Sequence, residues 1–407
     1  MTAVTAAPKG IYLDNNATTR VDPRVVEAML PFFTEQFGNP SSIHSFGADV
    51  GKAVRWAREQ VKALLGAEHD SEIVFTSGGT ESDNAAILSA LKTQVGRDEI
   101  ITSAVEHPAI LALCEYLAKH EGYTLHVIPV DSLGRLDMDA YAKALSEKTA
   151  VVSFMWANNE TGTIFPIARL AAMAKKVGAL FHTDAVQAVG KIPLDLAHTD
   201  VDFLSLSGHK LHGPKGIGAL YVRRGTRFRP MIRGGHQERD RRAGTENTTG
   251  IVGLGKACEL ALAHMEEENT RVRALRDKLE KAIIGQVSHC FVTGDWENRL
   301  PNTCNIAFEY IEGEAILLFL NRMGIAASSG SACTSGSLEP SHVMRAMNVP
   351  FTAAHGATRF SLSRETTEAE IDATIAAVPG IIEKLRGLSP FWNKDTAKAE
   401  SFQPAYS

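Results

Sequence analysis

The sequence predicts an α/β protein with a large, mainly parallel sheet of seven strands and a smaller α+β region. The chain has 407 residues, a length that suits one large domain and one smaller one. Between about residues 70 and 225, seven short β-rich runs alternate with helical patterns. Several runs are almost continuously apolar, as expected for strands buried on both faces. Strands that alternate with helices form mainly parallel sheets with right-handed crossovers.

The elements of the large domain follow in chain order. Apolar residues spaced by four and three predict an amphipathic helix before the sheet, with a buried stripe of Val50, Val54, Ala57, Val61 and Leu64. The seven predicted strands are 72–76, 99–103, 124–130, 150–155, 180–183, 203–206 and 217–222. A helix over 81–91 follows the first strand directly.

The pattern changes after the last of these strands. Residues 251–285 predict a long helix that is apolar at its start and highly charged later. This composition suits a connector between domains, although a solvated helix within one domain would read almost the same. Residues 286–390 predict an α+β region with strands at 305–308 and 358–363. We therefore expect a large domain of residues 20–260, a small domain of 1–19 plus 261–393, and a polar tail of 394–407.

Composition and charge exclude several classes of function. The formal net charge is -5 and there is no long Lys/Arg run, so nothing indicates nucleic-acid binding. No apolar stretch approaches the length of a membrane span. Residues 1–10 lack the basic start and apolar run of a secretory signal. We expect a cytoplasmic enzyme.

The five cysteines divide into two kinds. They form no CxxC pair and their number is odd, which fits a reducing compartment better than a disulfide framework. Four have apolar or helical surroundings and are expected to be small buried side chains: Cys114, Cys258, Cys290 and Cys304. Cys333 is surrounded by serine, glycine and threonine, which predicts a mobile loop over about 328–338. The alternative is a flexible surface loop with an incidental thiol.

Polar residues follow the predicted strands, one strand after another. Ligands of open α/β sheets bind outside the carboxyl ends of the strands. Five such groups together predict a pocket there: Ser77-Gly78-Gly79-Thr80-Glu81, Glu106-His107-Pro108, Asn158-Asn159-Glu160, Asp184-Ala185-Val186-Gln187 and Ser207-Gly208-His209-Lys210.

The first group has the features of an anion site. It opens a helix, so free backbone N–H groups and the positive helix end face any ligand. Gly78 and Gly79 would let an anion approach the backbone closely. The segment lacks the GxxxxGK[ST] pattern of nucleotide-binding loops. A helix cap without a ligand is the alternative.

Asp184 and Lys210 are the charged residues that need partners. Asp184 ends an apolar strand, where a bare carboxylate is costly, so it requires a cationic or proton-donating partner. A protonated cofactor ring nitrogen or a structural salt bridge would each serve. Lys210 also ends a strand, beside Ser207 and His209, where a lysine can lose its proton and form a Schiff base. Its rival Lys215 lies in a Gly/Pro turn and is expected to be solvated.

Two other kinds of site fit the sequence poorly. His182, His209 and His212 lack a carboxylate or thiolate at metal-ligand spacing, so no resident metal is expected. The glycine-rich stretch 213–218 precedes a strand, whereas a dinucleotide-binding fingerprint must follow one.

These residues resemble those of the cysteine desulfurases, enzymes of the aspartate-aminotransferase-like fold (fold type I) that depend on pyridoxal 5'-phosphate (PLP). The resemblance extends from Tyr12 to Arg364 through the motifs SGGTESDN, EHPA, NNETG, HTDAVQ, SGHKLHGPKG, RRAGTEN and SSGSACTSGSLEPSHVMRAM. The last two motifs most resemble the NifS-type branch that is associated with nitrogen fixation.

The resemblance implies a role for each residue of the predicted pocket. Lys210 would hold PLP as a Schiff base, Asp184 would pair with its ring nitrogen, and His107 would stack on the ring and move protons. Gln187 would hydrogen-bond the phenolic oxygen. The phosphate would be held by Gly79, Thr80, Ser207 and His209, and by Thr245 of a second subunit. Asn159 and Arg359 would bind the substrate carboxylate, for which an arginine fork is well suited.

The implied reaction removes sulfur from L-cysteine, forms a persulfide on Cys333 and releases L-alanine. The implied partners are a second copy of the chain and an iron–sulfur scaffold of NifU type. Cys333 would make a transient contact with an iron–sulfur cluster. A selenocysteine lyase, an aminotransferase and a non-catalytic sulfur carrier are the alternatives. An aminotransferase would not need Cys333, and a carrier would not need Lys210, Asp184 and His107 together.

Overall fold

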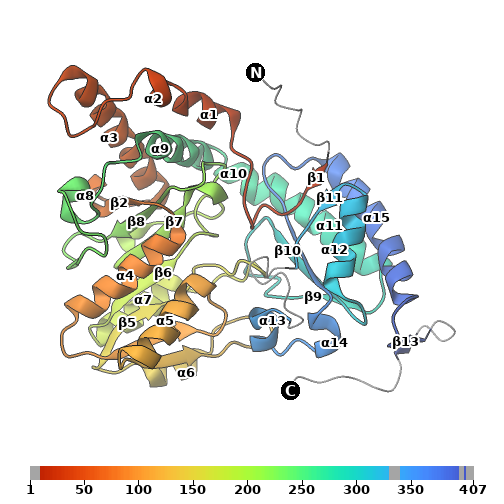
Figure 1. The fold of residues 1–407 in the computed structure, drawn as a ribbon. Coiled ribbons are helices and arrows are strands. Elements are labelled where there is room, and N and C mark those ends of the chain that lie inside the picture. The colour runs from red at the N-terminus through yellow and green to blue at the C-terminus, as the bar shows by residue number, and fades with distance from the viewer. Residues whose placement is uncertain (1–9, 330–339, 394–397, 400–407) are drawn as a thin grey trace. The chain divides into compact units, whose positions relative to one another are not determined.

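The computed structural model describes residues 10–329, 340–393 and 398–399 (Figure 1). The chain divides into two compact units, each with its own core. The larger unit contains Thr18–Asn159 and Thr163–Glu266. The smaller unit contains Met1–Ala17, Glu160–Gly162 and Glu267–Ser407.

The larger unit is built on the predicted seven-stranded sheet. In chain order the strands are β2 (Ile73–Thr76), β3 (Glu99–Ser103), β4 (Thr124–Ile128), β5 (Thr149–Ser153), β6 (Leu180–Asp184), β7 (Phe203–Ser207) and β8 (Gly218–Val222). Their order across the sheet is β2-β8-β7-β6-β5-β3-β4. All seven strands that the sequence predicts are therefore confirmed.

The sheet is mainly parallel, as predicted, and β8 is the exception. Strand β8 is antiparallel to both β2 and β7, whereas the remaining neighbours are parallel. Because β8 reverses direction between them, β2 and β7 run the same way. The carboxyl end of β2 thus lies at the same edge of the sheet as those of β3, β5, β6 and β7.

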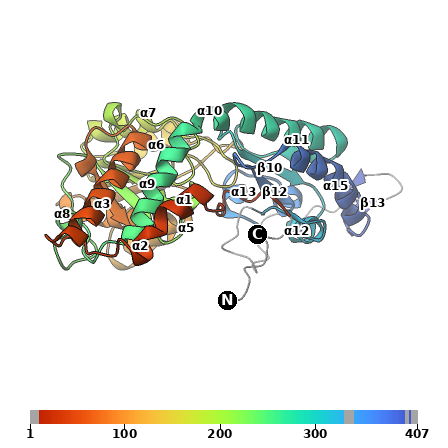
Figure 2. The same ribbon diagram turned by 90° about the horizontal axis from the view of Figure 1, so that it is seen from above.

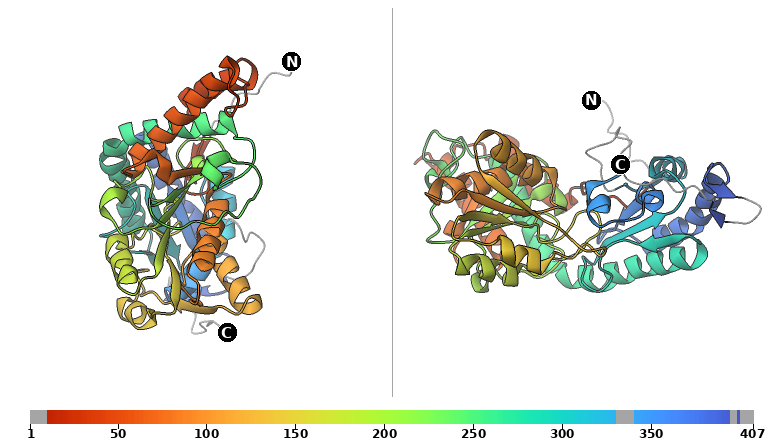
Figure 3. Two further views of the ribbon diagram at one scale, coloured as in Figure 1. Left: turned by 90° about the vertical axis from the view of Figure 1, so that its left-hand side faces the viewer. Right: turned by 90° about the horizontal axis from the view of Figure 1, so that it is seen from below.

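Helices cover both faces of this sheet (Figure 3). On one face, α4 (Gly79–Thr93) packs across β5 to β8, and α5 (Pro108–His120) follows β3. Helix α7 (Ile167–Lys176) packs on β6, and α6 (Met138–Ala144) lies near β4. Strands β5, β7 and β8 are buried along their whole length, as their continuous apolar character predicts.

The predicted amphipathic helix before the sheet is α3 (Ser45–Leu65), and its five predicted stripe residues are all buried. It packs side by side with α9 (Thr248–Ala263), next to α1 (Pro23–Met29) and α2 (Pro31–Thr34) (Figure 2). Gly255 makes this close approach possible, because a Cβ atom there would lie 2.5 Å from Cα of Ala57.

The smaller unit has the predicted α+β character. Its main sheet has the order β12-β10-β9, from β9 (Cys290–Val292), β10 (Thr303–Phe308) and β12 (Ala357–Ser361). A second sheet pairs β1 (Ile11–Tyr12) with β11 (Ile325–Ala326). Helices α11 (Arg273–Gln286), α12 (Gly313–Arg322) and α15 (Glu368–Arg386) bury apolar side chains against these strands. The shorter elements are α13 (His342–Ala346), α14 (Phe351–Ala354), β13 (Trp392–Asn393) and β14 (Lys398–Ala399).

The single long helix predicted over 251–285 is wrong in detail. Helix α9 ends at Ala263, α10 (Met265–Glu267) follows, and a π-helical turn over Glu268–Val272 precedes α11. A π turn contains one more residue than an α turn, so the side chains after it point in a different direction around the helix axis. The apolar and charged stretches therefore do not lie on one continuous helix face. Within the described residues, no helix is long and apolar enough to cross a membrane.

Candidate active site

Four of the five polar groups predicted from the strand ends lie wholly in the larger unit, at the carboxyl edge of its sheet, whereas Glu160 of the fifth belongs to the smaller unit. Strand β2 leads into α4, β3 leads to His107, β6 ends at Asp184, and β7 leads into the short turn Gly208–Lys210. Because these strands run in the same direction, their carboxyl ends bring the groups together. The predicted residues Gly79, Thr80, Gln187, Ser207 and His209 belong to the same edge.

The start of α4 is shaped for an anion. Gly78 precedes the helix, and its backbone lies so close to β8 that a Cβ atom at Gly218 would be 2.7 Å from Cα of Gly78. No side chain caps the helix at Gly78, and Thr80 in its first turn is exposed. The first N–H groups of a helix have no partner within it. They are therefore available to an anionic group at this end of α4.

His209 follows two residues after Ser207, whose Cβ atom would lie 3.9 Å from a Cβ atom at Gly79, and it is a neutral side chain. Its Nδ1 atom is 3.1 Å from Oγ1 of Thr18. Burial, together with the positive charges of Lys210 and Lys215, lowers the pKa of His209 to about 4. At neutral pH the imidazole can hydrogen-bond an anion without adding a charge of its own.

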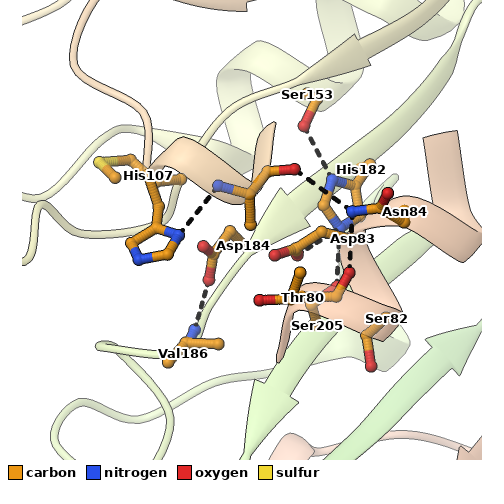
Figure 4. Close-up of polar contacts among 12 residues, drawn as sticks. Thr80, Ser82, Asp83, Asn84, His107, Ser153, His182, Asp184, Val186 and Ser205 are labelled. Carbon is orange, nitrogen blue, oxygen red and sulfur yellow. Dashed lines mark hydrogen bonds and ion pairs between the residues drawn. The ribbon is translucent and has the colours of Figure 1, made fainter. Parts of the chain in front are cut away.

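Asp184 is a buried carboxylate that lies near His107 (Figure 4) and interacts electrostatically with both His107 and Lys210. It retains 8% exposure, and its Oδ1 atom accepts a hydrogen bond of 2.9 Å from the backbone N–H of Val186. Burial raises the pKa of Asp184, while the Val186 N–H, His107 and Lys210 act to lower it. The carboxyl group thus lies where a cationic partner would stabilise its charge.

His107 is held by the helix that follows it. It is the N-cap of α5, and its Nδ1 atom accepts a hydrogen bond of 3.1 Å from the backbone N–H of Ala109. Pro108 occupies the first helical position, where a missing N–H costs nothing. Because Nδ1 acts as the acceptor, the neutral ring carries its proton on Nε2.

Lys210 ends a single 3-10 turn, Gly208–Lys210, directly after β7. Its side chain is half-buried, whereas that of Lys215 is exposed. Electrostatic interaction links Lys210 to Asp184 and to His209. The structure therefore brings Lys210, Asp184, His107 and His209 together, and it leaves Lys215 in solvent as predicted.

The remaining predicted residues have different positions. Asn159 is half-buried at the end of its stretch of the larger unit, and Thr245 is exposed in the segment before α9. Arg359 belongs to the smaller unit, where it lies on β12, is 2% exposed and pairs with Asp14 at 2.8 Å. Cys333, with residues 330–339, lies outside the described residues.

The prediction for the other cysteines is confirmed for three of the four. Cys114, Cys258 and Cys304 are buried, and Cys290 is half-buried. The difference at Cys290 arises because β9 lies at the edge of its sheet, with only β10 beside it. The Sγ atom of Cys290 donates to the carbonyl oxygen of Val287 at 3.1 Å.

The histidines considered for a metal site are each engaged separately. His182 lies between two serine hydroxyls, and His212 places Nδ1 3.0 Å from the carbonyl oxygen of Arg20. Across residues 10–329 and 340–393, no group of three His, Cys, Asp or Glu side chains could hold a metal ion.

A buried polar cluster lies behind Asp184 and was not predicted from the sequence. It contains Asp83 on α4, Glu106 before α5 and His182 on β6. One signal was available, because His182 and Asp184 are two residues apart and so share a face of the sheet. Asp83 belongs to α4, and only the tertiary fold shows that it reaches this face.

Three comparisons relate the chain to known proteins. Residues 11–374 match the Aminotransferase class-V family. A cysteine desulfurase of Gluconacetobacter diazotrophicus is 69% identical over 98% of this chain and 99% of its own length. The cysteine desulfurase NifS of Azotobacter vinelandii is 67% identical over 97% of this chain and 99% of its own length.

The chain belongs to the cysteine desulfurases of the Aminotransferase class-V family. The fold agrees, because a solved NifS-like protein superposes on this cysteine desulfurase with a TM-score of 0.86. That protein is 39% identical and is covered completely, against 92% of this chain. The predicted family and the predicted fold class are both confirmed.

Proposed function

We propose that this desulfurase binds PLP at the carboxyl edge of its seven-stranded sheet and uses it to take sulfur from L-cysteine. The observation that carries the proposal is the carboxyl group of Asp184, buried beside Lys210 and His107. Within the described residues this carboxyl group accepts one hydrogen bond, from the backbone N–H of Val186 to Oδ1. The carboxyl group therefore has acceptor capacity left for a protonated ring nitrogen.

The other residues at this edge fit the remaining parts of PLP. The uncapped start of α4, with Gly79 and Thr80, suits the phosphate, and Ser207 and neutral His209 add hydrogen-bonding groups. Gln187 would hydrogen-bond the phenolic oxygen, and Lys210 would hold the cofactor covalently. When bound, PLP supplies an electron sink for the carbon that loses its proton.

His107 and the substrate-binding pair would orient the amino acid. We propose that His107 stacks on the cofactor and exchanges protons through Nε2, since Nδ1 is occupied by the α5 cap. Arg359 would bind the substrate carboxylate together with Asn159. Asp14 holds the guanidinium of Arg359 at 2.8 Å and so fixes the direction of its fork.

Cys333 would accept the sulfur. Its thiolate attacks the sulfur atom of the substrate, so that a sulfur–sulfur bond forms and the carbon–sulfur bond breaks. The electron pair of the broken bond remains with the substrate carbon, which takes up a proton, and L-alanine leaves. The product on the enzyme is a persulfide of Cys333.

We further propose that the active enzyme is a homodimer. The segment from the end of α1 to the start of α3 exposes several large apolar side chains, which is unusual for a monomer surface: Leu30, Phe33, Phe37, Ile43 and Phe46. Thr245 is also exposed, as a residue that serves the phosphate of a second subunit would have to be.

The physiological setting follows from the branch that the sequence resembles. We propose a cytoplasmic enzyme that gives sulfur to an iron–sulfur scaffold of NifU type for nitrogenase maturation. The large domain of residues 20–260 would bind PLP, and the small domain of 1–19 plus 261–393 would carry Cys333. Identity of 67% to a NifS of Azotobacter vinelandii supports this assignment.

The test is the release of alanine from L-cysteine in the presence of a reductant, with the wild type compared with Cys333→Ala. We expect the wild type to form alanine and the variant to form none, although it still binds PLP as judged by absorbance. Cys290→Ala is the matched control and should keep its activity. Equal activity of Cys333→Ala would remove Cys333 as the acceptor, and a wild type without alanine release would overturn the proposed reaction.

A further inference from the structure

A cluster of buried polar side chains lies behind Asp184, away from the residues assigned to the reaction. His182 is completely buried on β6, with Nδ1 2.8 Å from Oγ of Ser153 and Nε2 2.9 Å from Oγ of Ser205. Asp83 reaches the same ring from α4, with Oδ1 3.5 Å from Nε2 of His182. Figure 4 shows the imidazole between Ser153 and the pair formed by Asp83 and Ser205.

Asp83 is an unusual carboxyl group in this position. It is 1% exposed, and its Oδ1 atom accepts no hydrogen bond within the described residues. No lysine or arginine in the described part of the chain forms an ion pair with it. An ionised carboxylate without a cation or a full set of donors is strongly destabilised in such surroundings. A carboxylic acid that keeps its proton avoids this cost.

His182 does not supply the missing positive charge. Burial lowers the pKa of His182 to about 3, so the ring is neutral at physiological pH. It therefore interacts with Asp83 and the two serines only as a hydrogen-bonding group.

The surrounding charges also favour a neutral Asp83. Burial raises the pKa of Asp83 well above its ordinary value, and the carboxyl groups of Asp184 and Glu106 raise it further. Ser205 acts in the opposite direction through a hydrogen bond. On the other side of the cluster, burial raises the pKa of Cys114 to about 12, so this thiol adds no charge. Of the three acids only Asp184 has its pKa lowered by basic side chains, those of His107 and Lys210.

The position of the cluster links it to the proposed cofactor site. His182 and Asp184 project from the same face of β6, since they are two residues apart. Hydrogen bonds with Ser153 on β5 and with Ser205 on β7 fix the His182 ring from both neighbouring strands, one ring nitrogen donating and the other accepting. This arrangement holds the end of β6, and with it the carboxyl group of Asp184.

We propose that Asp83 is a positioning residue that keeps its proton, supports His182 and Ser205 behind β6, and leaves the negative charge of the cluster on Asp184. This inference rests on the proposed function, because the purpose of the charge on Asp184 is to pair with the cofactor ring nitrogen. Asp83 acts through its neighbours and does not touch the cofactor.

Infrared spectroscopy of the whole protein labelled with carboxyl-¹³C aspartate tests the protonation directly. The label separates aspartate from Glu106, so the stretch of a protonated aspartic acid becomes visible. We expect this band between about pH 6 and 8, and we expect Asp83→Asn to abolish it. The exposed Asp49→Asn is the control and should leave the band unchanged. A wild-type spectrum without the band would overturn the proposal.

The affinity for PLP, measured by absorbance titration, tests the positioning role. The amide of Asp83→Asn mimics a neutral acid, so its affinity should stay within about threefold of the wild type. Asp83→Ala should weaken PLP binding by about tenfold or more, since the support of His182 is lost. Equal losses in the two variants, or no loss in either, would contradict the role. A wild type that shows the band but binds no PLP would instead contradict the proposed function alone.

Discussion

At the scale of single residues, the chemistry of the site depends on which of its buried carboxyl groups is ionised. Asp184, Asp83 and Glu106 are three buried acids, but only Asp184 interacts electrostatically with His107 and Lys210, whereas the histidine beside Asp83 is neutral. Sequence alone does not show that Asp83 and Glu106 lack such partners, because the flanking residues do not reveal what packs against each carboxyl group. Strand-end position led to the prediction that Asp184 and Lys210 have partners in a pocket, since a charged residue after an apolar strand requires a partner. The environment of Asp83 depends on the packing of α4 across the sheet, which no local pattern encodes.

The first prediction concerns Asp184. Asp184→Asn keeps the size and the hydrogen bond from Val186 but removes the charge, so under the proposed function the ring nitrogen of PLP would lose its anionic partner. We expect alanine formation to fall by about 100-fold or more. Absorbance should show that PLP remains bound through Lys210. Activity within about threefold of the wild type would contradict the assignment of Asp184.

The second prediction concerns Glu106 and the pH dependence of stability. Glu106 is fully buried, and burial raises its pKa from 4.5 to about 8 in the folded protein. Between these values the folded state holds a proton that the unfolded state releases. This group therefore makes the free energy of unfolding decrease as pH rises, by about 1 kcal/mol per pH unit.

Glu106→Gln removes this titration while its amide oxygen can still accept from Ser103 and Met155. The stability of the variant relative to the wild type should therefore increase from about pH 5 to pH 8. Urea denaturation at several pH values measures the difference. A constant difference across this range would show that Glu106 does not keep its proton.

At the scale of helices and strands, the periodicity of apolar residues predicted the elements that are buried on one face or on both faces. The apolar runs predicted all seven strands of the large sheet, and the stripe from Val50 to Leu64 predicted α3. The π turn at Glu268–Val272 was not predicted, because it depends on the fit of neighbouring segments and leaves no periodic signal. The antiparallel direction of β8 was also missed, since apolar strands look alike in either direction.

The third prediction tests the crossing of α3 and α9. A Cβ atom at Gly255 would lie 2.5 Å from Ala57, so Gly255→Ala must push the helices apart. We expect a loss of about 1–3 kcal/mol in the free energy of unfolding. Gly380→Ala in α15 is the matched control, because nothing lies within 4 Å of its Cβ position. The control should be neutral or more stable by about 0.5–1 kcal/mol in chemical denaturation. Equal effects at the two positions would contradict the packing argument.

At the scale of the whole molecule, composition and motifs predicted the two-part α/β architecture and the family. The fold class followed from the alternation of strands and helices, and the family followed from motifs that extend along most of the chain. The assembly could not be derived in this way. A single sequence does not distinguish an apolar side chain that fills a core from one that meets a second subunit, and the exposure of Phe33 became visible only in the structure.

The fourth prediction tests the proposed dimer. Phe33 and Phe37 are 64% and 66% exposed, so Phe33→Ser with Phe37→Ser should change the stability of one subunit very little. If these side chains meet a second copy, the double variant should weaken dimer formation by about tenfold or more. Sedimentation analysis measures this, with the 91% exposed Val95→Ser as the control. Unchanged association of the double variant would show that Phe33 and Phe37 do not lie in the dimer interface.

The cap that His107 forms on α5 has a consequence for its proposed role in binding the cofactor. The ring orientation is set when the helix forms, so no rotamer search remains when a ligand arrives, and less entropy is lost on association. The same contact makes the helix start sensitive to the charge of the ring. A proton on Nδ1 would compete with the N–H of Ala109, so the cap disfavours that form and keeps proton exchange to one side of the imidazole. The hydrogen bond that stabilises the start of α5 thus also favours the form of His107 with its proton on Nε2.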